Sequence, residues 1–187
     1  MSYLVKGFGD SRMIQRIVQC ALLAVGLSLA SVMQAKTTED IRQYGAWKVN
    51  CTMEQVDGCY MSLLGKGKDG DEAIFRVGVR YETYNDRLQP LLKVLVPLGV
   101  SLMQAPVLTI AIDRPEGPKS FVLDYSRCVD VGCLSVKVLS PGLRDHLRNG
   151  HTGTLMFVDG IGKIHKYSFS LRGSSRALAL VQQNRAL

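Results

Sequence analysis

The sequence predicts an all-β protein, an antiparallel sandwich or barrel, from three observations. Short segments alternate apolar and polar residues, which is typical of strands that are buried on one face. Turn signals rich in glycine or proline separate these segments about every ten residues, with no long amphipathic helices between them. The chain has 187 residues, of which 47% are hydrophobic. This length suits one ordinary domain, and this composition excludes wholesale disorder.

The N-terminal segment is typical of an export signal. Three basic residues precede an uncharged, mostly apolar run at 17–33, and the chain turns polar from Lys36 onward. A basic segment, an apolar core and a small residue before a polar stretch are the features of a secretory signal peptide. We therefore expect 1–35 to be a signal peptide, cleaved after Ala35, and 36–187 to form a single β-sandwich domain.

A retained membrane anchor is the alternative, because an apolar run of about 17 residues is at the short limit for crossing a bilayer. The protein would then be an accessory subunit of a membrane-bound complex, held by its uncleaved N-terminal helix. Cleavage would remove three basic residues and one acidic residue, so the net charge of +7 would fall to +5. It would also remove Cys20 and leave four cysteines.

An even number of cysteines in an exported chain indicates disulfide bonds. Cys51 and Cys59 flank the turn signal Asp57-Gly58, and Cys128 and Cys133 bracket a short loop. This spacing favours two local pairs. Cross-pairing of the two halves remains open, and so does a zinc site, although the tight C-x2-C spacing that zinc prefers is absent.

The strand candidates follow the chain from Trp47 onward. Phe75, Val77, Val79 and Tyr81 alternate with polar or small residues, and 165–171 alternates in the same way. Glycine or proline signals for turns and loops stand between many of them, including the glycine-rich stretch 65–70. In order, the candidates are 47–52, 60–64, 75–81, 91–96, 107–113, 120–125, 134–139, 154–158 and 165–171.

Two short helices interrupt the strand pattern, and we expect both to be peripheral. The first begins at Ser140-Pro141, an N-cap followed by a proline at the first helical position, and ends before Gly150. The second covers about 174–184, where Ala177, Leu178 and Val181 form an apolar stripe.

Catalytic chemistry is not evident in the sequence. His165 is in phase with the buried residues of its strand, so we expect it to be packed. His146 and His151 lie in a basic region, and we interpret them as solvated. The enzymatic alternative is a hydrolase that uses either histidine together with Asp145. No nucleophile-elbow or zinc-protease motif is present.

Cofactor motifs are absent as well. The stretch 65–70 lacks the order of a phosphate-binding loop, and the neighbouring Asp69, Asp71 and Glu72 lack the spacing of a calcium loop. We therefore expect no enzyme activity, no cofactor and no metal.

Basic residues gather toward the C-terminus and form a candidate surface for an anionic partner. Export argues against nucleic acid as that partner and favours a protein or another envelope component, otherwise unknown. A mildly basic surface without a specific partner is the alternative. The candidate residues are Arg144, Arg148, Lys166, Arg172 and Arg176.

Several ordered segments carry a resemblance to a known family. They are Trp47-Lys48-Val49-Asn50-Cys51, Val96-Pro97-Leu98-Gly99-Val100, Ile112-Asp113, Gly132-Cys133 and Ser170-Leu171-Arg172-Gly173. With them, residues 44–184 resemble the invasion-associated locus B family of exported bacterial proteins.

The resemblance implies an immunoglobulin-like β-sandwich located in the periplasm, at the outer surface or outside the cell. The resemblance implies no catalytic activity. For some members of the family it implies a link to host-cell interaction. One departure is Ser174, where we expect an aromatic residue, so we predict looser packing of the last helix. The expected function is therefore that of a non-enzymatic binding module of the bacterial envelope.

The mature N-terminus tests the export prediction. We expect mass spectrometry of the protein isolated from the native envelope to find a chain that begins at Lys36. An intact Met1 or Ser2 would instead favour the anchored accessory subunit.

Overall fold

The computed structural model describes residues 40–51, 58–66 and 73–185. The chain divides into the units Met1–Lys36 and Thr37–Leu187, and every described residue belongs to the second unit. The predicted signal peptide lies outside the described residues, and so do Asp57 and most of the glycine-rich stretch with its three acidic neighbours.

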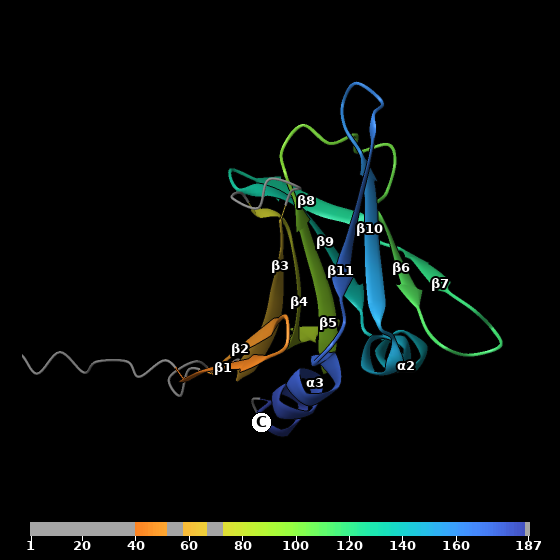
Figure 1. The fold of residues 1–187 in the computed structure, drawn as a ribbon. Helices are drawn as coiled ribbons and strands as arrows, with labels where there is room; N and C mark the ends of the chain where they lie inside the picture. The colour runs from red at the N-terminus through yellow and green to blue at the C-terminus, as the bar shows by residue number, and fades with distance from the viewer. Residues whose placement is uncertain (1–39, 52–57, 67–72, 186–187) are drawn as a thin grey trace, which may run out of the picture. The chain divides into compact units, whose positions relative to one another are not determined.

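The described residues form two antiparallel sheets and two short helices, which confirms the predicted all-β class (Figure 1). The first sheet contains, in spatial order, β1 (Asp40–Tyr44), β2 (Trp47–Cys51), β3 (Cys59–Lys66), β4 (Ala73–Tyr84), β5 (Arg87–Val96), β9 (Gly132–Val138) and β8 (Tyr125–Val129). The second contains β11 (Ile164–Ser170), β10 (Thr152–Val158), β6 (Val107–Ala111) and β7 (Lys119–Val122).

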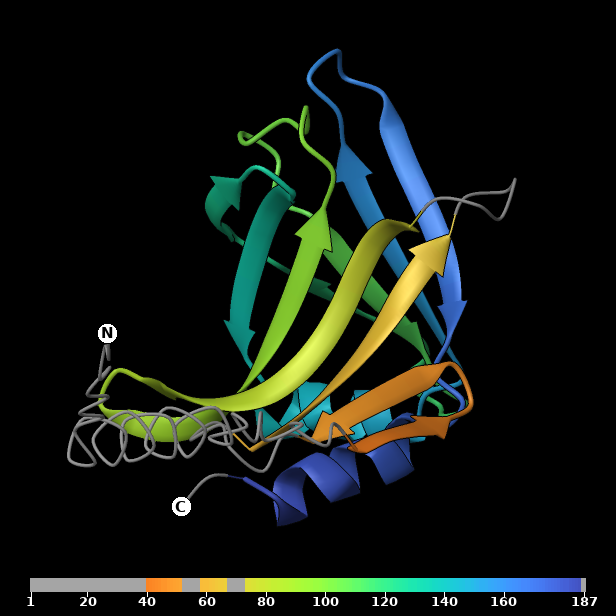
Figure 2. The same ribbon diagram turned by 90° about the vertical axis from the view of Figure 1, so that its left-hand side faces the viewer.

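The topology does not show an immunoglobulin-like strand order. Five successive strands, β1 to β5, lie side by side in one sheet. Immunoglobulin domains instead distribute their strands between two sheets by Greek-key connections. Long strands β4 and β5 curve across the first sheet (Figure 2). They are joined by the two-residue turn Asn85-Asp86, in which both residues have positive φ, as a tight hairpin requires.

One apolar core lies between the sheets. Val77 and Val79 of β4 are buried, as their alternation predicts, and so are Leu108 of β6 and Leu155 of β10. Trp47 at the start of β2 is completely buried in the same cluster. Each of these strands therefore contributes alternate side chains to a core that belongs to both sheets.

One strand prediction is corrected, and one strand was missed. The segment 120–125 is not one strand, because β7 ends at Val122 in one sheet and β8 begins at Tyr125 in the other. The apolar alternation continues across this change of sheet because Leu123 is buried as well. Strand β1 was not predicted, since an edge strand with mostly exposed residues has no buried face to produce the alternation.

Both predicted helices are present. Helix α2 (Pro141–Asn149) begins after Ser140, whose hydroxyl oxygen accepts a hydrogen bond from the Leu143 N–H at 3.3 Å. The Gly150 N–H donates to the carbonyl oxygen of His146 at 2.8 Å and closes the last turn. Helix α3 (Ser174–Gln183) buries Ala177, Leu178 and Val181, together with Ser174.

The start of α3 is held against two other elements. Gly173 has φ +95°, and a Cβ atom there would lie 2.0 Å from the carbonyl oxygen of Tyr44, so the contact with the β1–β2 turn requires glycine. The buried Ser174 hydroxyl donates to the Leu147 carbonyl oxygen of α2. The serine therefore links the two helices by a hydrogen bond, and the looser packing of the last helix stays a prediction.

Ser174→Ala tests this link. The variant would leave a buried carbonyl oxygen without its donor, so we expect the free energy of unfolding to fall by about 1–3 kcal/mol. Ser175→Ala is the matched control, because Ser175 is exposed, and it should change stability by less than about 0.5 kcal/mol. Urea unfolding followed by circular dichroism measures both. Equal stabilities of the two variants would contradict the link.

Candidate interaction surface

Two disulfides join neighbouring strands, with the pairing that the cysteine spacing favours. Cys51 and Cys59 are joined at 2.03 Å across β2 and β3, and Cys128 and Cys133 at 2.00 Å across β8 and β9. Each pair is directly opposite in its ladder. The neighbouring turn that we predicted from Asp57-Gly58 lies mostly outside the described residues.

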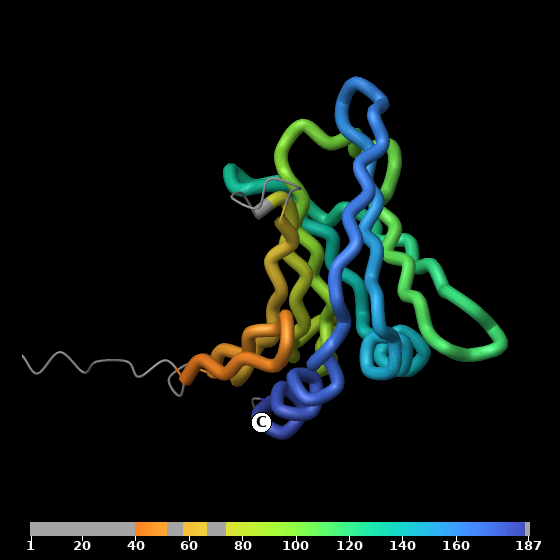
Figure 3. The backbone as a smooth tube through the Cα atoms, viewed as in Figure 1, coloured from red at the N-terminus to blue at the C-terminus, as the bar shows by residue number. Residues whose placement is uncertain are grey.

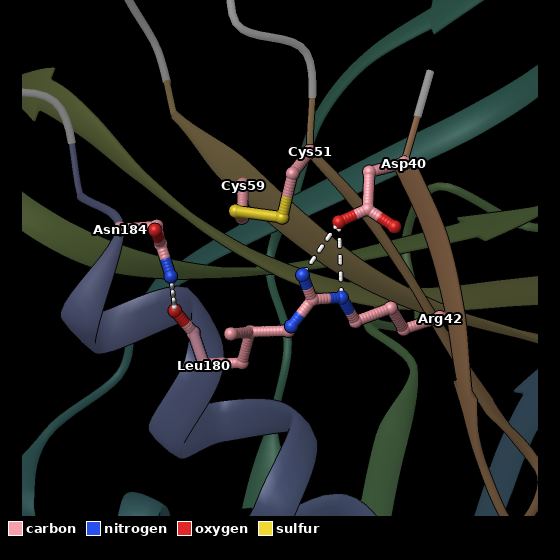
Figure 4. The surroundings of a disulfide bond; sticks show 6 residues. All are labelled: Asp40, Arg42, Cys51, Cys59, Leu180 and Asn184. Carbon is pink, nitrogen blue, oxygen red and sulfur yellow. Dashed lines mark hydrogen bonds and ion pairs between the residues drawn. A yellow bond between two sulfur atoms is a disulfide. The ribbon is translucent and has the colours of Figure 1, made fainter. Parts of the chain in front are cut away.

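The first disulfide lies where the sheet meets the end of α3 (Figure 4). The Cys59 N–H donates to the carbonyl oxygen of Asn184 at 3.2 Å. The Asn184 side chain in turn donates to the Leu180 carbonyl oxygen at 2.9 Å. The disulfide therefore holds β3 in place at Cys59, the residue to which the end of α3 is hydrogen-bonded.

Four of the five candidate cationic residues gather where the two helices meet. Arg144 and Arg148 lie one turn apart on α2, each directly after a buried leucine, on the flank of the helix beside its buried side. Arg172 and Arg176 flank the first residues of α3. We call Arg144, Arg148, Arg172 and Arg176 the arginine surface.

Two shallow hollows lie within the arginine surface, and both are lined by Ser175. The larger, of about 530 Å³, lies between the β1–β2 turn and the start of α3, with Arg172 and Arg176 in its lining. The smaller, of about 330 Å³, is lined by Arg144 and Arg148. The helix contacts described above place all four arginines around adjoining hollows.

Lys166, the fifth candidate, is not part of this surface. It lies on β11 opposite Met156 of β10, near the start of the strand. It lies six positions before Arg172, which corresponds to roughly 20 Å along an extended strand. Closeness in sequence therefore does not bring Lys166 to the arginines.

The charge of the arginine surface is not compensated by carboxylates within the described part of the chain. Asp145 is the one acidic residue in the lining of the two hollows, and Arg114 binds it at 2.7 Å. The Asn149 amide also donates to it, at 2.7 Å. The hydrogen bond from Arg114, more than any other contact, holds the pKa of Asp145 below its usual value. Asp145 thus remains ionised and is already paired.

The structure does not bring a histidine into hydrogen-bond contact with Asp145. The His146 ring contacts the Gly142 carbonyl oxygen at 2.9 Å, and His151 lies 3.3 Å from an oxygen of Asp113. Asp145 is engaged by Arg114 and Asn149 instead. The pairing of His146 or His151 with Asp145, on which the hydrolase alternative was based, is therefore not formed.

His165 is packed, as its phase in the strand predicts. Its ring stacks on Phe157 with centroids 5.3 Å apart, and its Nε2 contacts Asp159 at 2.9 Å. This hydrogen bond lowers the pKa of Asp159 more than any other contact. The pairing was missed from the sequence, where Asp159-Gly160 indicates only a hairpin turn. The shortness of the hairpin was the signal that could have revealed it, because five residues between Val158 and Ile164 return His165 close to Asp159.

A second charged group was also missed. Glu82 on β4 binds Arg80 at 2.8 Å and accepts a hydrogen bond from Lys93 on β5.

Among the described residues no group of three or more metal-ligating side chains is present. No helix in 40–51, 58–66 or 73–185 is long and apolar enough to cross a membrane.

Comparisons with known proteins identify a family. The family model described as "Invasion associated locus B (IalB) protein" matches residues 47–182. The crystal structure of invasion associated protein B from Bartonella henselae superimposes with a TM-score of 0.62 at 20% identity, covering 77% of this chain and 96% of that one. That likeness shows a shared fold. No curated protein sequence matches this chain.

The two disulfides can be verified on the purified protein. We expect no free thiols in the mature chain, and proteolytic peptide maps that join Cys51 to Cys59 and Cys128 to Cys133, because each pair is already opposite in its ladder. Thiol labelling with and without reductant, followed by mass spectrometry, measures this. A peptide that links one cysteine from each half would contradict the pairing.

Proposed function

Because this chain belongs to the invasion-associated locus B family, we propose that it is an exported, non-enzymatic envelope protein that binds an anionic partner through the arginine surface. The observation that carries the proposal is the gathering of four arginines around two adjoining hollows whose one carboxylate, Asp145, is already paired with Arg114. The partner is a protein or another component of the envelope.

Family and chemistry support the proposed location. The family consists of exported bacterial proteins, and the two disulfides are consistent with a compartment outside the cytoplasm. We place the protein in the periplasm, at the outer surface or outside the cell. The positions of His146 and His151, away from hydrogen-bond contact with Asp145, support a role without catalysis.

Arginine suits an anionic partner for a physical reason. Its planar guanidinium offers several N–H donors and forms paired hydrogen bonds with a carboxylate or phosphate. The helices that present the arginines are fastened through Ser174 and Leu147, so their positions are set before binding. A preformed surface loses less conformational entropy when it binds.

Binding to a host-cell component is a narrower form of the same proposal. It rests on the name of the family and on the name of the related Bartonella protein, both of which refer to invasion. The arginine surface would then meet an anionic molecule of the host in place of one from the bacterial envelope.

Site-specific crosslinking tests the proposal. A photoreactive amino acid replaces Ser175, which is exposed and lines both hollows. We expect illumination of the native bacterium to produce a defined adduct. The adduct should disappear when Arg144, Arg148, Arg172 and Arg176 are all changed to Gln. Illumination in the presence of host cells tests the narrower form.

Lys163→Gln combined with Lys166→Gln is the matched control, since both lysines are exposed and lie outside the arginine surface. The adduct should survive in this variant. An adduct that persists in the arginine variant, or the absence of any adduct, would count against the arginine surface as the binding site.

A further inference from the structure

Large apolar side chains are exposed together at the end of the sheets away from the helices. They lie on three connections: 97–106 between β5 and β6, the β8–β9 turn, and the β10–β11 hairpin (Figure 1). Met103 and Ile161 are the most exposed, at 93% and 90%. We call this set the apolar end; its members are Leu98, Leu102, Met103, Val131, Ile161 and Ile164.

The connections that carry these side chains are held by backbone hydrogen bonds. The Gly160 N–H donates to the Gly99 carbonyl oxygen at 2.6 Å, and the Ser101 N–H to the Val158 carbonyl oxygen at 2.8 Å. The segments at 97–106 and 159–163 therefore lie together (Figure 3). Because the backbone is tied, the side chains project instead of folding back onto the sheets.

The charges around the apolar end form a consistent pattern. The ten residues from Pro97 to Pro106 include no charged side chain. Asp159 is occupied internally, since its carboxylate accepts hydrogen bonds from the backbone N–H groups of Ile161 and Lys163 and contacts His165. The exposed Lys163 and Lys166 lie in and just after the β10–β11 hairpin, next to Ile161 and Ile164. In the described part of the chain, Asp130 is the one exposed carboxylate on the three connections of the apolar end.

This combination matches the interface of an anionic bilayer. An uncharged apolar centre enters the acyl boundary, while lysine amines beside it remain among the phosphate groups. A protein partner would need a separate pocket for each of three projecting connections, whereas a fluid bilayer accommodates any set of convex tips. Exposed apolar patches of this kind mark sites of association in soluble proteins.

We propose that the apolar end inserts into the interfacial region of a lipid bilayer that contains anionic lipid. Strand β10 separates this end from α2, since the strand follows the helix directly and ends at the β10–β11 hairpin. The arginine surface would thus remain about 20 Å from the membrane and free to bind its partner. The two sites share no residue, so either can fail alone.

Vesicle binding tests the proposal. The probes are vesicles of phosphatidylcholine with and without phosphatidylglycerol, and the sample is the full protein purified from the envelope. We expect sedimentation with the anionic vesicles. The double variant Leu102→Ser with Met103→Ser should bind at least about tenfold more weakly, because it removes apolar side chains that insertion buries.

The matched control changes two apolar residues that are exposed elsewhere. Ile41→Ser combined with Leu88→Ser removes exposed side chains on β1 and on β5 near its hairpin turn. This variant should bind vesicles as the native protein does. Circular dichroism and thermal unfolding verify that both double variants are folded.

Depth of insertion provides a second measurement. In a Met103→Trp variant, quenching of the new indole by brominated lipid reports contact with acyl chains, because Trp47 is completely buried and shielded. We expect quenching of the Met103→Trp protein and none of the native protein.

Two results would overturn the proposal. One is equal vesicle binding by the native protein and the Leu102/Met103 variant, which includes the absence of binding by both. The other is sedimentation equilibrium showing a native dimer that the same variant converts to a monomer, because the apolar end would then be an interface between two copies. Quenching of the Met103→Trp indole separates this test from that of the arginine surface, because a contact between the arginines and lipid phosphates, about 20 Å from the apolar end, would not bring that indole among the acyl chains.

Discussion

Each sheet of this protein has one apolar face, and neither face is removed from water unless the other sheet covers it. This constraint produces the single core to which both sheets contribute, and in which Phe75 of β4 packs against Tyr167 and Phe169 of β11. It also explains the change of sheet between Val122 and Tyr125, because the chain crosses from one layer to the other while Leu123 remains buried. Burial of both faces therefore decides the topology more than any local preference does.

The two sheets cover each other's apolar faces but not the two ends of the core, and these ends, at either end of β10, have different surfaces. At one end α2 and α3 bury their apolar sides and leave four arginines outside. At the other end only connections between strands are present in the described part of the chain, and their apolar side chains remain exposed. Gly173 and Ser174 set the geometry of the first end, while the hydrogen bond between Gly99 and Gly160 sets that of the second.

Many of the residues that carry the family resemblance are structural in this protein. Trp47 and Val49 are buried in the core, and Cys51 and Cys133 form disulfides. Gly173 has a positive φ and touches the β1–β2 turn, as required for the start of α3. A pattern made of such residues identifies a fold and an exported family, and it does not point to a reaction. The proposed functions rest on surfaces that share only single residues with the pattern, Arg172 in the arginine surface and Leu98 in the apolar end.

The sequence by itself predicted most of the strand segments, both helices and the family, and it favoured the local cysteine pairs, because these depend on neighbours a few residues away. Alternation predicted β4, and Ser140-Pro141 predicted α2. Tertiary structure alone decided that Arg172 and Arg176 join Arg144 and Arg148 while Lys166 does not, and that Asp159 pairs with His165. It also decided the place of β1 at the sheet edge and the clustering of apolar tips. The physical reason is that these relations depend on how strands are assigned to sheets, which follows from burial of the whole core.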